Sequence, residues 1–178
     1  MTGQVPGGLT EWSIVVLRLR IMGMAARKLE EVKARQQRAD ESLRLTLAAS
    51  DAANDGAPHL WDDLRDYVES EVKQFSEGLP AAKHLSSYRD NENKLVVETN
   101  VLPIVKLEIV RSGMYVQASR WELRPQCNSE KLAKAGRYKF TVDRKLNPCL
   151  TDGENVLHPT QVADRWLKPV FDFFDDPA

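Results

Sequence analysis

The chain has 178 residues, of which 42% are hydrophobic and 29% charged, and its formal net charge is −1. This apolar content suffices for one globular domain with a sizeable core, so the composition excludes disorder along the whole length. A net charge near zero gives no overall field that would attract nucleic acid or an acidic membrane surface.

The charges are unevenly distributed along the chain. Residues 50–80 contain eight acidic and two basic residues, whereas residues 81–147 contain seven acidic and thirteen basic ones. Acidic helices packed on a basic sheet explain this pattern, because surface charge mainly serves solubility. A basic sheet face that binds an anionic partner is the alternative.

The N-terminal part is expected to form a helical arm. Residues 1–10 are rich in Gly and Pro and are expected to be disordered, whereas residues 11–50, the arm, are rich in strong helix formers. Two arginines interrupt its most apolar stretch, which is therefore neither a membrane span nor a signal peptide. Methionines just before the best helical pattern leave open whether residues 1–21 belong to the native protein.

An apolar seam runs along one side of the arm. Its members are spaced mostly three or four residues apart, as neighbours on one helix face must be, and they are Leu29, Val32, Ala39, Leu43 and Leu47. Polar Gln36 interrupts the series. Because such a narrow stripe suits a helical hairpin or a short coiled coil, we expect Leu29, Val32, Leu43 and Leu47 to lie at an interface.

Residues 50–58 have the composition of a loop. Pro58 suits the first turn of a second helix, which continues to about Ser76 before Gly78 and Pro80 end it. The two helices would form a hairpin, and the main domain is placed at residues 51–178.

Five strands with β-branched and aromatic residues follow, expected at residues 94–99, 104–111, 114–123, 138–143 and 148–151. Ser112-Gly113 predicts a tight hairpin between the second and the third strand. A short helix is expected at residues 129–133. The pattern of the third strand does not decide whether its Arg120 face or its Trp121 face is buried.

A last helix is expected from Gln161 to about Phe174, capped by Thr160 and kinked or split at Pro169. Strands grouped between helices indicate the α+β class. The expected fold is an antiparallel sheet of about five strands packed by helices, with an N-terminal helical hairpin or arm.

Two cysteines, Cys127 and Cys149, are too few for a disulfide framework, and their spacing fits no zinc site. A single disulfide between them stays open, because both flank the strand expected at residues 138–143. Free thiols in a reducing cytoplasm are favoured.

The chain carries no recognisable catalytic, metal or nucleotide-binding motif. Four acidic residues between Asp62 and Glu69 are interpreted as a solvated helix face, because no histidine stands at helical spacing to complete a metal site. The three histidines are isolated from one another in the sequence. We therefore expect no catalytic residue, metal or cofactor.

The expected function is a non-enzymatic protein-interaction or adaptor module that works in the cytoplasm as a homodimer or with a protein partner. This expectation rests on the amphipathic arm and on the missing catalytic constellation.

Two alternatives remain open. The first is a nucleic-acid binder that uses a basic sheet face, because interleaved cations and aromatic rings contact phosphates and stack on bases. Its candidate residues are Lys106, Arg111, Arg120, Trp121, Arg137, Tyr138 and Lys139. The second is a small-ligand pocket between the sheet and the C-terminal helix, lined by Trp121 and Trp166, into which Arg120 or Tyr138 points.

Overall fold

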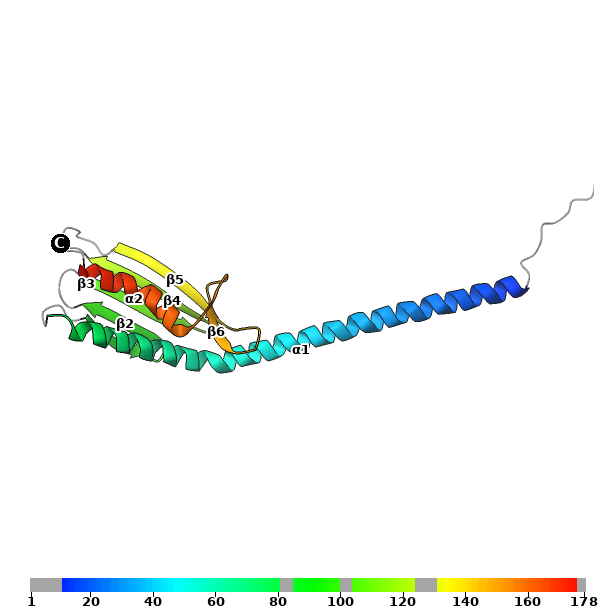
Figure 1. The fold of residues 1–178 in the computed structure, drawn as a ribbon, viewed down its shortest axis with the longest axis horizontal. Helices are drawn as coiled ribbons and strands as arrows, with labels where there is room; N and C mark the ends of the chain where they lie inside the picture. Colours follow the sequence, from blue (N-terminus) through cyan, green and yellow to red (C-terminus); the bar gives the residue numbers. More distant parts are fainter. Residues whose placement is uncertain (1–10, 81–84, 100–103, 124–130, 176–178) are drawn as a thin grey trace, which may run out of the picture. The chain divides into compact units, whose positions relative to one another are not determined.

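The structure is a computed structural model that describes residues 11–80, 85–99, 104–123 and 131–175 (Figure 1). Residues 1–10, for which disorder is expected, and Cys127 lie outside these ranges. The described part contains two helices and one antiparallel sheet of seven strands, which confirms the predicted α+β class. The chain divides after Leu47 into two units, residues 1–47 and 48–178.

Helix α1 runs without interruption from Glu11 to Glu77. The loop predicted at residues 50–58 is therefore wrong, and the two helices predicted to form a hairpin are one helix. Pro58 lies inside it and cannot donate a hydrogen bond to the carbonyl of Asn54. Both residues are exposed, so water can satisfy that carbonyl, and the helix tolerates the proline.

Tertiary packing holds this turn of α1 in a helical conformation. Ala53 and Ala57 are buried, and burial of a helix face contributes more to its stability than local propensity does. Gly56 is also buried, and a Cβ atom at this position would overlap the ring of Pro148 in the sheet. The small residues that suggest a loop therefore allow the helix to approach the sheet closely.

Every strand of the sheet pairs with its neighbours in the chain. The strands are β1 (Leu85–Asn91), β2 (Lys94–Thr99), β3 (Ile104–Ser112), β4 (Tyr115–Leu123), β5 (Lys131–Val142), β6 (Pro148–Thr151) and β7 (Val156–Leu157). The sequence predicts five of them. It misses β1, whose composition is polar, and β7, which has only two residues.

Strand pairing tests two local predictions, the short helix before the fourth predicted strand and the hairpin at Ser112-Gly113. The short helix predicted at residues 129–133 is wrong, because β5 begins at Lys131 and its residues pair with β4 from Glu122 onward. The hairpin predicted between β3 and β4 is confirmed. Gly113 in its loop has a φ of 57°, a left-handed conformation that glycine adopts without strain.

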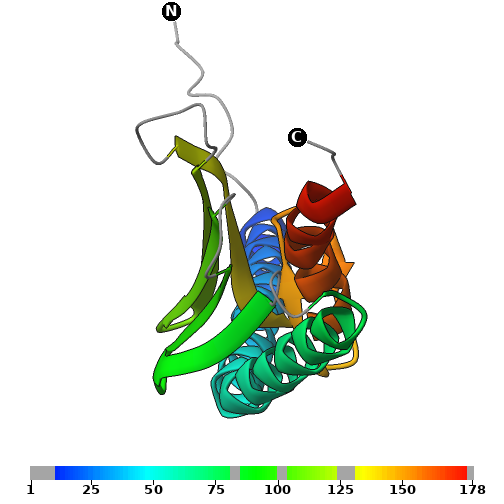
Figure 2. The same ribbon diagram turned by 90° about the vertical axis from the view of Figure 1, so that its left-hand side faces the viewer.

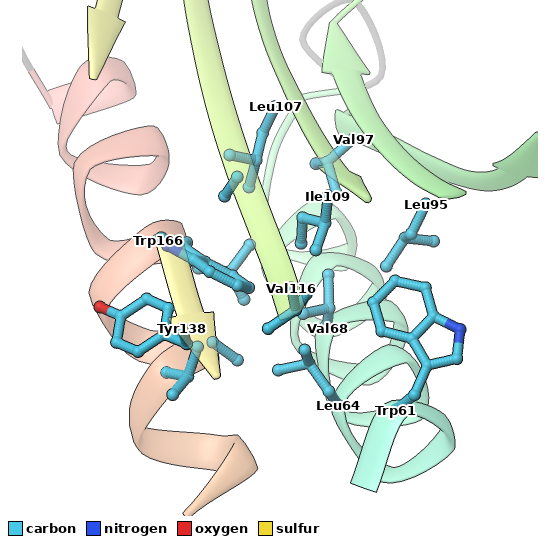
Figure 3. Packing of buried hydrophobic residues seen from close by; sticks show 14 of the residues in the cluster. Trp61, Leu64, Val68, Leu95, Val97, Leu107, Ile109, Val116, Tyr138 and Trp166 are labelled. Atoms are coloured by element: carbon cyan, nitrogen blue, oxygen red, sulfur yellow. The ribbon is translucent and has the colours of Figure 1, made fainter. Parts of the chain in front are cut away.

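Helix α2 (Pro159–Asp175) and the part of α1 after residue 48 cover the same face of the sheet, which we call the inner face (Figure 2). Alternate strand residues point into this layer and form the core, together with Trp61, Leu64 and Val68 of α1 (Figure 3). Val116 and Ala118 are buried in it, so the Arg120 side of β4 is the inner one. The opposite side of the sheet, with Trp121, is the outer face.

Helix α2 begins two residues earlier than predicted. The backbone N–H of His158 donates to the side-chain oxygen of Gln161 at 2.9 Å, which makes His158 the cap instead of Thr160. The helix continues through Pro169, so it is not split there. Neither helix, within the ranges described above, has a stretch long and apolar enough to cross a bilayer.

Candidate functional site

The arm presents its apolar side chains at the surface. From Gly23 to Leu47 every side chain is exposed except that of Ala34, which is half-buried. The exposed set includes all four residues predicted to lie at an interface, which are Leu29, Val32, Leu43 and Leu47. An exposed apolar series on one helix is a surface suited to association.

Ion pairs lie on the charged side of the arm. The Lys28 ammonium is 3.0 Å from a Glu31 carboxylate oxygen, and the Lys33 ammonium is 3.6 Å from Glu30. Pairs at this spacing stabilise an exposed helix by only about 0.2–0.5 kcal/mol each. They partly neutralise the charge beside the seam.

Four of the seven predicted sheet residues lie on the outer face, namely Lys106, Trp121, Arg137 and Lys139. Lys106 pairs with Glu108 at 3.1 Å, so its charge is already compensated. The Arg137 guanidinium lies 3.8 Å from the centre of the Tyr115 ring, a cation–π contact. Trp121 is half-buried opposite Lys106.

The other three, Arg111, Arg120 and Tyr138, lie on the inner face. Arg111 stacks over the Phe140 ring, with 5.7 Å between the guanidinium carbon and the ring centre. Tyr138 is buried and packs edge-on against Trp166, with ring centres 5.4 Å apart. The structure therefore does not bring the seven candidate residues of a nucleic-acid surface onto one face.

A small cavity lies between the inner face and α2. Ala118 and Gly136 are directly paired across β4 and β5, and their small side chains leave space beneath Trp166. The free space within it is about 10 Å³, room for about one water-sized group, and it opens to solvent. Its lining consists of Leu107, Ala118, Arg120, Gly136, Arg165, Trp166 and Pro169.

Two side chains of this lining have buried N–H groups without an acceptor. Arg120 binds Glu122 through Nη2, which is 3.0 Å from Oε1. Its Nε and Nη1, like Nε1 of Trp166, are buried, and no acceptor in the described part of the chain lies within hydrogen-bond distance of them. Such groups are rare in folded proteins, because each loses its bonds to water without replacement.

Arg165 lies at the same cavity and is held by a turn of the sheet. Its Nη1 is 3.0 Å from Oδ2 of Asp152, an acidic residue in the turn between β6 and β7. The pKa of Asp152 is far below its usual value, because backbone N–H groups of Asn155 and Glu154 and the Arg165 guanidinium all donate to its carboxylate. This pair fixes the start of α2 against the sheet.

Three acidic residues of α1 in the second unit pair with arginines. Asp62 binds Arg65 on the same helix, and Arg89 of β1 binds both Asp66 and Glu69. The hydrogen bond to Glu69 raises the pKa of Arg89 further above its usual value. Among the described side chains, no group of three potential ligands is placed to hold a metal ion.

Cys149 is a free, buried thiol on β6, and burial raises its pKa. Its predicted alternative, a disulfide with Cys127, involves a residue outside the described ranges. His158 is the cap of α2 and contacts the Thr160 hydroxyl with Nδ1 at 3.1 Å.

Sequence reasoning places Arg120 and Trp166 at a pocket but does not identify Gly136 or Arg165. It also places Trp121 in the lining, whereas Trp121 lies on the opposite face of the sheet. One signal was available: Arg120 alternates with Val116 and Ala118, which puts a cation on an otherwise apolar strand face.

Comparison of the chain with the models of known protein families, with curated proteins and with solved structures finds no significant match.

Proposed function

We propose that the protein is a non-enzymatic interaction module that self-associates through the seam of its arm to form a homodimer. The observation that carries the proposal is the exposure of the seam, from Leu29 to Leu47, on a well-formed helix. A single helix without packed neighbours is only marginally stable in water. Burial of the seam against a second copy would remove apolar surface from water and stabilise the arm.

The spacing of the seam supports a two-stranded coiled coil. Leu29, Gln36 and Leu43 follow one another at intervals of seven residues, and Val32 and Ala39 take the second core position of the first two heptads. In the third heptad this position is Thr46, and Leu47 lies beside it at a flanking position. A polar residue such as Gln36 at a core position favours a defined register at a cost in stability.

The charges beside the seam support a parallel arrangement. Arg35 and Asp40 occupy the flanking positions that meet across a parallel dimer, five residues apart, and have opposite charges. Lys28 and Lys33 also meet there and repel each other, but each pairs with a glutamate of its own helix.

Two leucines of the arm provide a matched test of the proposal. Leu43 belongs to the seam and Leu45 lies about 200° away around the helix, yet both are 60% exposed. Full-length protein and the variants Leu43→Glu and Leu45→Glu would be compared by light scattering over a range of concentrations. We expect native protein and Leu45→Glu to approach twice 20.2 kDa and Leu43→Glu to remain at 20.2 kDa.

A native mass of 20.2 kDa at every concentration would show that the arm does not self-associate. Equal loss of the dimer in both variants would show that general hydrophobicity, instead of the seam, drives association.

A cytoplasmic location is part of this proposal. It is supported by Cys149, a free thiol, because such thiols persist in reducing compartments.

A further inference from the structure

The cavity beneath α2 has an unusual chemical character, because its unpartnered polar groups are all hydrogen-bond donors. Arg120 contributes N–H groups at Nε and Nη1, and Trp166, which is 5% exposed, contributes one at Nε1. Neither a guanidinium nor an indole can accept a hydrogen bond. A ligand that satisfies them must therefore supply acceptors.

The position of the Trp166 N–H connects this donor to the cavity. A Cβ atom placed on Gly136 would lie 3.1 Å from Nε1 of Trp166, and Gly136 itself lines the cavity. The absence of a side chain at residue 136 therefore lets the indole N–H lie close to the strand, at the wall of the cavity. Ala118, the strand partner of Gly136, extends the same space toward Arg120.

Each guanidinium at the cavity already has a carboxylate partner, Glu122 for Arg120 and Asp152 for Arg165. Arg120 binds Glu122 only through Nη2, however, so its Nε and Nη1 groups remain charged donors. An anionic acceptor attracts these donors more strongly than a neutral acceptor does. The free space admits a single ligand oxygen, so the rest of the ligand would lie in the opening to solvent.

We propose that the space bounded by Arg120, Gly136 and Trp166 binds a small carboxylate group, which accepts hydrogen bonds from the Trp166 indole and the Arg120 guanidinium. The site is independent of the seam on the arm. It assigns a ligand-binding role to the second unit of the chain.

Indole N–H resonances in proton–nitrogen NMR spectra of the full chain provide the test. The chain has four tryptophans, and Trp61 is an internal control because its N–H is already bonded to the Glu92 carbonyl. Sodium formate would be added at constant ionic strength. We expect a saturable shift of the Trp166 resonance, assigned by its loss in Trp166→Phe, with the Trp61 resonance unmoved.

Two variants separate binding from structural effects. Arg120→Gln should keep the Trp166 resonance in a well-dispersed spectrum and reduce its affinity for formate at least tenfold. Trp121→Phe, the same ring exchange on the outer face, should leave the titration unchanged. A linear shift of all indoles with salt, or a saturable shift that survives Arg120→Gln, would overturn the proposal.

Other probes identify the source of the carboxylate. If N-acetylglycine shifts the Trp166 resonance at lower concentrations than formate, the carboxylate belongs to the end of a peptide-like ligand. If formate shifts the Trp166 resonance and N-acetylglycine does not, the carboxylate belongs to a free small acid. Saturation by chloride without any response to formate or N-acetylglycine would contradict a carboxylate site.

Discussion

Trp61 donates its indole N–H to the carbonyl oxygen of Glu92, with 2.8 Å between the two heavy atoms. This bond connects α1 to the tight turn between β1 and β2, and Arg65 donates to the same oxygen at 3.0 Å. Trp166, also buried, has no such acceptor among the residues that the structure describes. The two indoles thus differ in chemistry: the first completes a structural contact, and the second leaves a donor facing a cavity.

Replacement of Trp61 by Phe should lower the free energy of unfolding by about 2 kcal/mol. The loss combines the hydrogen bond to Glu92 with the space that the smaller ring leaves in the core. Urea denaturation would measure it. Trp121→Phe, at a half-buried outer-face position, should cost less than half as much, and an equal cost would contradict the structural role of the Trp61 bond.

Replacement of Gly56 by Ala should destabilise the protein, although alanine is the better helix former. A Cβ atom at residue 56 overlaps the ring of Pro148, and relief of such a clash costs about 1–3 kcal/mol. Gly23→Ala is the matched control, because a Cβ there meets nothing within 4 Å and should stabilise the helix by up to about 1 kcal/mol. Pro148→Gly, which removes both overlapping atoms, Cβ and Cγ, should rescue Gly56→Ala in thermal denaturation, and failure to rescue would locate the clash elsewhere.

Glu108 should stabilise the outer face at neutral pH and lose this effect in acid. Burial alone would raise its pKa, but hydrogen bonds from Lys106 and Lys94 outweigh burial and hold the pKa below its usual value. Since the folded pKa is the lower one, the stabilisation is present above the unfolded pKa and disappears as the pH falls through the folded pKa.

The variant Glu108→Gln measures this effect. We expect its free energy of unfolding to be about 1 kcal/mol lower than that of the native protein at pH 7, with the difference closing toward pH 3. Urea titrations at several pH values would record it. Glu154→Gln, at an exposed position, serves as a control. If the difference between Glu108→Gln and the native protein persists unchanged at pH 3, packing of the side chain, and not its charge, is responsible.

Gln36→Leu should strengthen self-association of the arm by about tenfold in dissociation constant, because it replaces a polar core position by an apolar one. Sedimentation equilibrium would measure the change. Gln37→Leu adds the same side chain on the next position around the helix and should have little effect. If both variants tighten the dimer equally, the heptad assignment of the seam is wrong.

The strands of the sheet were largely predictable because their residues alternate in polarity. The continuity of α1 was not, since Gly56 and Pro58 suit a loop when they are considered locally. Their helical state depends on contact with Pro148, about ninety residues further along the chain, which no local pattern encodes. Similarly, β5 begins at Lys131 only because β4 provides a partner.

Of the two candidate sites, one could be predicted from local sequence pattern and the other depends on tertiary contacts. The seam on the arm is a local periodic signal and could be identified from spacing alone. The cavity depends on the pairing of Ala118 with Gly136 and on the placement of Trp166 above them, which are tertiary relationships. The sequence could indicate that Arg120 alternates with apolar residues, but it could not indicate that two of its nitrogens would find no acceptor within the described structure.

The order of strands has a consequence for assembly of the second unit. Because each strand pairs with the one made just before it, the sheet can grow hairpin by hairpin as the chain leaves the ribosome, with short loops to close. The inner face of β4 and β5 is thus complete before α2 has been synthesised. Trp166 arrives last, so docking of the final helix both seals the core and creates the cavity.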